Sequence, residues 1–138
     1  MTKHIFVVLL IVCCFGCSKK QTEALNCPAQ FCTAVFASVN VQFQDKNGSA
    51  VMVKNYSVVN KRTKESLVPA NQQGINDAGY YTIVNDGSLK KLSTEGDEIV
   101  VSAKHPTTGQ TKITTYKISG GCNCHVMRIS GPQVITFD

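Results

Sequence analysis

The sequence predicts an all-β protein, an antiparallel Greek-key β-sandwich of about seven to eight short strands. Apolar and polar residues alternate with a period of two in several segments, which is typical of strands that bury one face. Glycine, proline and asparagine separate these segments at short intervals. After the first twenty residues, no window of twelve residues shows the 3.6-residue period of an amphipathic helix.

The first half of the domain is expected to hold two long strands and a short one. Apolar side chains occupy the odd positions of residues 35–43, and an Asp-Lys-Asn-Gly turn follows at 45–48. A second strand is expected at 51–59, and a short return strand at 66–68. Residues 69–74 show no strand pattern and form the longest expected loop.

The second half continues with a strand at 79–84 that ends in an Asn-Asp-Gly turn at 85–87, which we expect to close a hairpin. Turns that contain glycine or proline divide the rest of the chain. The remaining strands are expected at 99–103, 111–118, 125–129 and 133–137.

Two short motifs add a family resemblance. Residues 43–48 followed by Val51, and the Gly-Tyr-Tyr-Thr-Ile segment at 79–83, resemble modules of the carboxypeptidase-regulatory or transthyretin-like kind. The resemblance implies a small Greek-key sandwich that serves as a binding or spacer domain and not as a catalyst. A fold by itself does not specify a function.

The amino terminus has the layout of a secretory signal peptide. Lys3 and His4 precede an apolar run at 5–15, which Gly16 and Cys17 end. As a helix this run spans about 16 Å, whereas the hydrocarbon core of a bilayer is about 30 Å thick. The segment resembles the lipobox of bacterial lipoproteins, in which the cysteine is acylated, with palmitate among the acyl chains, and becomes the first residue of the mature chain.

This second resemblance implies a domain organisation and a location. We expect a signal peptide at 1–16, a lipidated tether at 17–30 and the sandwich at 31–138. Acyl chains on Cys17 would anchor the protein in the envelope of a Gram-negative bacterium. A serine after the cysteine, here Ser18, resembles the sorting signal of lipoproteins sent to the outer membrane. Both the periplasmic and the external face stay open.

The charge pattern bears on the partner class. The formal net charge is +5, yet the basic residues are spread along the chain and form no dense run with interleaved aromatics. A nucleic-acid partner is therefore not expected. A protein or a glycan partner stays open. Two observations argue against a glycan platform: the chain has no tryptophan, and the alternation puts one of Tyr80 and Tyr81 in the core.

Of the seven cysteines, Cys13 and Cys14 lie in the apolar run of the signal peptide and Cys17 is assigned to lipid. Four are left: Cys27, Cys32, Cys122 and Cys124. An exported protein meets an oxidising compartment, and four cysteines allow three pairings. A bridge between Cys122 and Cys124 would close a strained ring. We therefore expect two disulfides that join the amino-terminal pair to the carboxy-terminal pair and staple the first strand to the last hairpin, with both connectivities open.

The alternative function is a thiol-redox or metal-binding protein that uses Cys122, Cys124 and His125. Thiolates and imidazole are good zinc ligands, but Cys-x-Cys-His is not the usual Cys-x-x-Cys spacing. We expect His125 to be satisfied by a neighbour, and we expect no metal and no cofactor. No common catalytic motif occurs, and neither His105 nor His125 has an evident nucleophile nearby, so the protein is predicted not to be an enzyme.

Two further expectations concern polar segments. Any binding surface is expected on loops at one end of the sandwich, around residues 69–74 and 85–91, because rigid scaffolds present binding groups on loops. Four acidic residues lack the spacing of a calcium loop and are predicted to be ordinary turn and strand-edge acids. They are Asp86, Glu95, Asp97 and Glu98.

Overall fold

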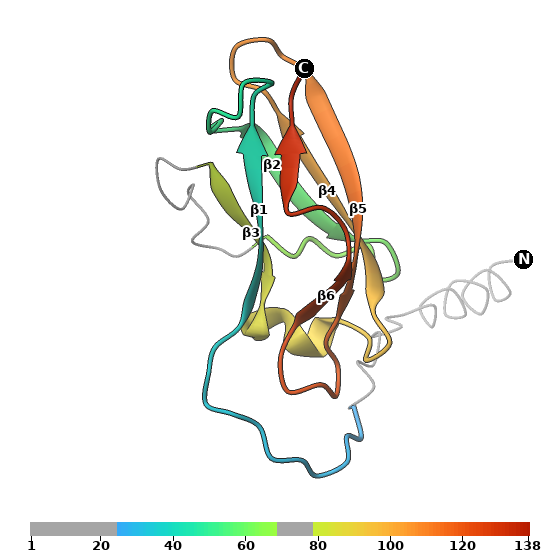
Figure 1. Ribbon diagram of the computed structural model, residues 1–138. Helices are drawn as coiled ribbons and strands as arrows, with labels where there is room; N and C mark the ends of the chain where they lie inside the picture. Colours follow the sequence, from blue (N-terminus) through green and yellow to red (C-terminus); the bar gives the residue numbers. More distant parts are fainter. Residues whose placement is uncertain (1–24, 69–78) are drawn as a thin grey trace, which may run out of the picture.

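The computed structural model describes residues 25–68 and 79–138, and these form two β-sheets that face each other (Figure 1). One sheet has three strands in the order β3-β1-β7, and the other has four in the order β2-β4-β5-β6. The all-β sandwich predicted from the sequence is confirmed. The elements are β1 (Ser38–Gln44), β2 (Lys54–Asn60), β3 (Tyr80–Asn85), the 3₁₀ helix η2 (Asp86–Lys91), β4 (Asp97–Lys104), β5 (Thr111–Ser119), β6 (Met127–Ser130) and β7 (Val134–Thr136).

The chain crosses repeatedly between the two sheets. Only β4, β5 and β6 are consecutive neighbours in one sheet, whereas β1, β2, β3 and β4 alternate between the layers. Four of the five strand pairings are antiparallel, and β7 pairs with β1 in parallel. The reason is that the turn at 130–132 carries the chain from one sheet to the other instead of closing a hairpin between β6 and β7.

The core lies between the sheets and follows the predicted alternation. Along β1 the side chains of Val39, Val41 and Phe43 are buried, and their neighbours in sequence are more exposed. The ring of Phe43 lies 5.4 Å from that of Tyr81 and 6.0 Å from that of Phe137 between centroids. Aromatic contacts at this distance add to the free energy of burial.

The first strand begins at Ser38, three residues later than expected. Val35 and Phe36 are exposed, and residues 25–37 form no strand. The pairing partner explains the difference, because Ser38 pairs with Asn85, the last residue of β3. Beyond Asn85 the chain turns into η2, so no strand is left for residues 35–37 to pair with.

The hairpin expected at 85–87 is wrong. The strands β3 and β4 belong to different sheets, and η2 connects them across one end of the sandwich (Figure 1). The side chain of Asn85 caps the helix by accepting a hydrogen bond from the amide of Gly87 at 3.0 Å. Leu92, directly after the helix, is buried in the core and fixes its end.

Two other expectations are adjusted. The second strand begins at Lys54 instead of residue 51, and the return strand at 66–68 is reduced to one bridge between Ser66 and Val59. The turn at 45–48 forms, with the amide of Gly48 donating to Asp45 at 3.0 Å. The expected loop at 69–74 lies outside the described residues.

A buried carboxylate fixes the connection between η2 and β4. Asp97 accepts hydrogen bonds from Asn60 at 2.7 Å, from the guanidinium of Arg62 at 2.7 and 2.8 Å, and from the amide of Ser93 at 3.1 Å. Burial would raise the pKa of Asp97, but the hydrogen bonds from Arg62 and Asn60 outweigh it and hold the pKa below its ordinary value. The charged form of Asp97 therefore stabilises the fold.

We predict that Asp97→Ala lowers the free energy of unfolding by about 2 kcal/mol at pH 7, because buried Asn60 loses its acceptor. Since the folded-state pKa is depressed, the contribution of Asp97 is complete above its unfolded pKa of about 3.9 and is lost as the pH falls. The stability difference between wild type and variant should thus shrink in acid. Urea denaturation at several pH values measures it.

Glu98→Gln is the matched control, since Glu98 is the next residue on β4 and its ion pair with Lys61 is exposed at the surface. Loss of an exposed pair should leave the free energy of unfolding nearly unchanged at pH 7. Equal effects of the two substitutions would contradict the role given to Asp97.

Candidate functional site

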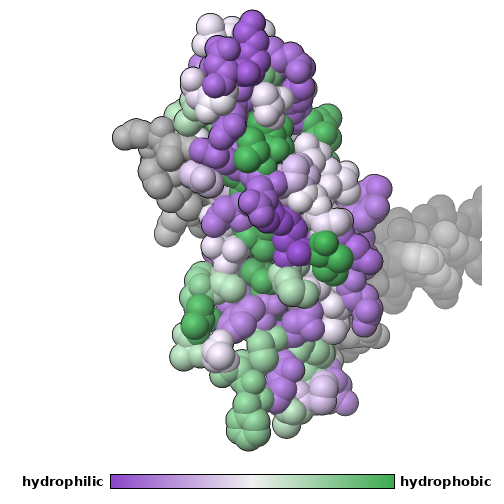
Figure 2. Space-filling view, viewed as in Figure 1, coloured by the Kyte–Doolittle hydropathy of each residue, from purple (hydrophilic) through white to green (hydrophobic). Residues whose placement is uncertain are grey.

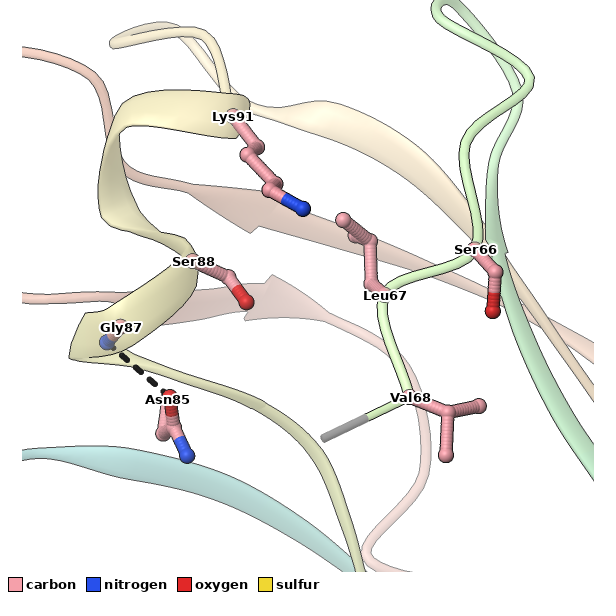
Figure 3. Close-up of a pocket in the computed structure, with 7 residues that line it drawn as sticks. All are labelled: Ser66, Leu67, Val68, Asn85, Gly87, Ser88 and Lys91. Carbon is pink, nitrogen blue, oxygen red and sulfur yellow. Dashed lines mark hydrogen bonds between the residues drawn. The ribbon is translucent and has the colours of Figure 1, made fainter. Parts of the chain in front are cut away.

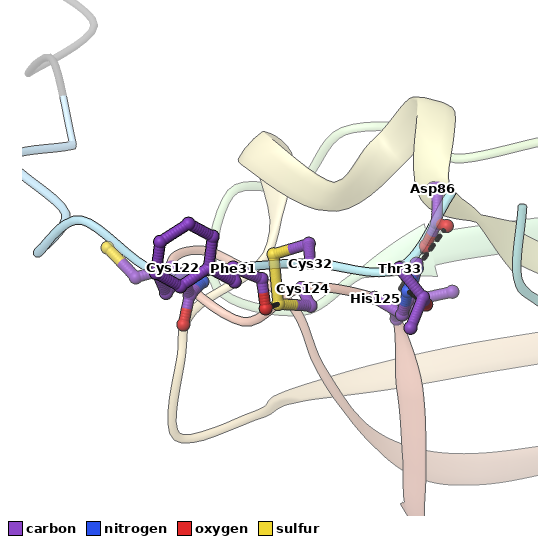
Figure 4. Close-up of a disulfide and its surroundings, with 9 residues drawn as sticks. Phe31, Cys32, Thr33, Asp86, Cys122, Cys124 and His125 are labelled. Atoms are coloured by element: carbon purple, nitrogen blue, oxygen red, sulfur yellow. Dashed lines mark hydrogen bonds and ion pairs between the residues drawn. A yellow bond between two sulfur atoms is a disulfide. The ribbon is translucent and has the colours of Figure 1, made fainter. Parts of the chain in front are cut away.

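Residues 25–37 form an extended arm that runs outside both sheets, past the end of the sandwich closed by η2 (Figure 1). Two disulfides hold it to the loop between β5 and β6. Cys27 is bonded to Cys122 and Cys32 to Cys124, with Cα atoms 5.2 and 5.3 Å apart. Figure 4 shows the Cys32–Cys124 bond. The predicted pairing between the two ends of the chain is confirmed. The staple, however, joins the arm to the β5–β6 loop instead of the first strand to the last hairpin.

The β5–β6 loop, residues 120–126, is itself fixed to the end of the sandwich. The amide of Gly121 donates to Leu89 of η2 at 2.8 Å, and the amide of Cys122 donates to the hydroxyl of Thr94 at 3.0 Å. Gly121 has a φ of +60°, and a Cβ there would come within 2.6 Å of the Thr94 hydroxyl. Glycine is therefore required where the loop turns towards the two cysteines.

Asp86, the first residue of η2, joins the arm to this loop. Its carboxylate accepts hydrogen bonds from the amide of Ala37 at 2.8 Å, from Nδ1 of His125 at 2.8 Å and from the amide of Val126 at 2.9 Å. Burial acts to raise the pKa of Asp86, and the bonds from Ala37, His125 and Val126 outweigh it, so the pKa lies below its ordinary value. One carboxylate thus connects three separate segments.

His125 extends the connection to the middle of the arm. Its Nε2 lies 2.9 Å from the hydroxyl of Thr33, so hydroxyl, imidazole and carboxylate form a continuous row (Figure 4). The prediction that His125 is satisfied by its neighbours is confirmed. The expectation that no nucleophile lies near it is wrong, because the hydroxyl of Thr33 contacts the imidazole. The two residues are 92 positions apart, so no local sequence pattern indicates the contact.

Hydrolases use the same order of groups to activate a hydroxyl. Here Thr33, His125 and Asp86 each belong to a different segment, and Asp86 also accepts two backbone amides. We therefore assign the row a positioning role, in which it fixes the part of the arm that follows Cys32.

A pocket of about 350 Å³ lies beside η2 (Figure 3). The Lys91 side chain extends towards Leu67 across this gap, and the hydroxyl of Ser88 faces it. Hydroxyl, amide and ammonium groups beside an apolar wall suit a small polar or anionic group. The lining residues are Ser66, Leu67, Val68, Asn85, Gly87, Ser88 and Lys91.

The pocket bears on the predicted binding surface. Four of its lining residues come from the segment 85–91 that the sequence indicated, whereas 69–74 lies outside the described residues. Within residues 25–68 and 79–138, no carboxylate lies within ion-pair distance of the Lys91 ammonium. Lys91 is therefore the cation that this pocket offers to a ligand.

The other candidate groups are placed as follows. The sulfurs of Cys122 and Cys124 are in disulfides, so they offer no thiolates beside His125. The described part of the chain contains no group of three metal-ligating side chains. Of the tyrosines considered for a glycan platform, Tyr80 is exposed, whereas Tyr56, Tyr81 and Tyr116 pack into the sandwich.

Cys17 and the rest of the proposed signal peptide lie outside the described residues. No helix found in residues 25–68 and 79–138 has the length and apolar character needed to cross a membrane.

We predict that Asp86→Ala speeds amide hydrogen exchange at Ala37 and Val126, because both amides lose their acceptor. Exchange in β4 and β5 should change little. Thr33→Val is the control, since it removes only the hydroxyl contact with His125. Hydrogen exchange read by mass spectrometry tests this. Unchanged protection of residues 33–37 and 126 in Asp86→Ala would show that the disulfides alone place the arm.

Comparison with protein-family models, with curated proteins and with solved structures finds no match to this chain. The resemblances to lipoproteins and to carboxypeptidase-regulatory modules therefore stay predictions.

Proposed function

We propose that the protein is a lipid-anchored envelope protein of a Gram-negative bacterium, and that its sandwich is a non-enzymatic binding or structural module. One observation carries the proposal: a lipobox-like segment that ends at Cys17 stands ten residues before a cysteine bonded into a double-disulfide staple. Structural disulfides persist in oxidising compartments, so the staple supports export. The signal-like segment supports the same route, and Cys17 supplies the attachment point for acyl chains.

The anchor sets where the module works. Acyl chains on Cys17 hold the protein in the membrane, and Ser18 favours the outer membrane. The segment between Cys17 and the arm is a short tether, so the sandwich stays close to the bilayer.

The binding role is supported by the pocket beside η2. Its polar groups come from the end of β3, from η2 and from the 66–68 segment, and the core holds the latter two in place through Leu92 and Leu67. The ammonium of Lys91 favours a partner with carboxylate or other anionic groups, as acidic proteins and acidic glycans have. A nucleic-acid partner is not part of the proposal, because the basic residues form no stripe.

Cys17→Ala should abolish acylation and release the protein from the lipid-modified fraction. The measurement is metabolic labelling with a fatty-acid analogue, followed by fractionation of the envelope. Cys14→Ala is the matched control, because Cys14 lies inside the apolar run and should not be acylated. A Cys17→Ala protein that still carries label would overturn the anchor.

A second candidate, a thiol-redox or metal-binding role for Cys122, Cys124 and His125, is favoured by one observation. Cys27 and Cys32 are exposed, and their partners are only partly buried, so small reductants can reach both bridges. Reduction would free thiolates beside His125.

Intact-mass measurement after alkylation separates the two candidates. For the binding module we expect no alkylation of Cys27, Cys32, Cys122 and Cys124 before reduction and complete alkylation after it. Free thiols in the protein as isolated from the envelope, or bound zinc, would favour the second candidate.

A further inference from the structure

We infer that the arm, residues 25–37, is a membrane-docking surface whose exposed apolar side chains enter the interface of the bilayer that holds Cys17. This inference rests on the proposed lipid anchor. It adds an orientation to the anchored domain, with the disulfide-stapled end against the lipid.

The arm is apolar, uncharged and exposed. None of its thirteen residues is charged, and the β5–β6 loop beside it has His125 as its one titratable side chain apart from the bonded cysteines. Phe31 is fully exposed, and Val35 and Phe36 are 67% and 68% exposed. Uncharged segments with protruding aromatic and aliphatic side chains suit the membrane interface.

The staple makes the arm a fixed surface. Cys27 and Cys32 are bonded to the β5–β6 loop, the side chain of Gln30 donates to the carbonyl of Cys122, and Thr33 contacts His125. Phe31 therefore protrudes from a backbone held on both sides. A surface that is already ordered loses less conformational entropy when it enters the interface than a free segment would.

The length of the tether selects the bilayer as the occupant. Cys27 lies ten positions after Cys17, which limits the distance between them to about 36 Å in a fully extended chain. Cys27 is fixed to the β5–β6 loop, so this end of the sandwich cannot move far from the membrane. Phe31 follows four residues later, on the same stapled segment.

The opposite end of the sandwich has a different character. It carries the β4–β5 loop and the carboxy terminus, where Lys112 pairs with Asp138 and Lys104 ends β4. Figure 2 shows this contrast, with purple residues gathered at the upper end and green residues more frequent at the lower end, where Figure 1 places the arm. Charged groups avoid the hydrocarbon of the bilayer, so the uncharged arm can enter the interface, whereas Lys90 and Lys91 of η2 and the charged opposite end stay outside it.

The absence of tryptophan from the chain allows a direct test. In the full-length acylated protein, Phe31→Trp places a single tryptophan on the arm. Ile113→Trp places one at an exposed site near the start of β5, towards the end of the sandwich away from the arm. Both proteins are reconstituted into vesicles of phosphatidylcholine and phosphatidylglycerol, with or without brominated acyl chains. Flotation with the vesicles reports the anchor, and quenching by bromine reports docking.

We expect both variants to float, and Phe31→Trp alone to shift its emission to shorter wavelength and to be quenched. Floating protein in which Phe31→Trp is not quenched would overturn docking and leave the anchor intact. A shifted but unquenched emission would show burial against protein, such as a second copy, and would also overturn docking. Failure to float would overturn the proposed anchor and the docking that rests on it.

Phe36→Trp is the second variant, chosen because Phe36 lies beyond both cysteines of the arm and is also exposed. Quenching at both positions would place the whole arm at the lipid. Reduction of the disulfides and alkylation of the released thiols should weaken the quenching of the tryptophan in Phe31→Trp, since the arm would no longer be held in place.

Discussion

The carboxylate of Asp86 is the contact on which the stapled end depends. It stands where η2, the arm and the β5–β6 loop meet, and it accepts hydrogen bonds from the other two. The disulfides limit how far the arm can move, but they do not set its direction between Cys32 and β1. Asp86 does so, because the amide of Ala37 donates to its carboxylate and its own amide donates to the carbonyl of Ala37 at 3.1 Å. The two disulfides and the partly buried carboxylate of Asp86 thus fix the arm together.

Asp97 plays the corresponding part at the other end of η2. Its carboxylate accepts hydrogen bonds from the amide of Ser93 and from the side chain of Asn60. The same side-chain amide of Asn60 also donates to the carbonyl of Lys91, the last residue of η2. The six-residue helix is therefore fixed at its start and after its end by two carboxylates whose pKa values lie below the ordinary value. This matters for function because η2 presents different groups in different directions: Asp86 towards the arm, and Ser88 and Lys91 towards the pocket.

The sequence was sufficient for the strands and for the class of disulfide pairing, and physical reasons explain both. Alternation records which face of a strand is buried, so β1, β4 and β5 were visible locally. Cys122 and Cys124 are too close in sequence to bond to each other, which left pairing across the domain. The late start of β1 and the helix η2 were missed because both follow from the sheet in which β3 lies, and no local pattern records that. The row of Thr33, His125 and Asp86 spans 92 residues and was missed for the same reason. One signal was available: Thr33 follows Cys32 and His125 follows Cys124, so a Cys32–Cys124 bridge brings them together.

The second disulfide is better explained by the arm than by the stability of the core. No residue of the buried core lies in the arm, and Ala37 alone packs against it. Cys27–Cys122 already closes a loop with a sequence separation of 95 and removes most of the chain entropy that such a cross-link can remove. Cys32–Cys124 closes nearly the same loop, so once the first bridge exists it constrains only the few residues between the two bridges. Those residues include Gln30 and Phe31. The added constraint therefore acts on the shape of the arm, which carries no charge and holds four of the ten large hydrophobic residues exposed in the described part of the chain.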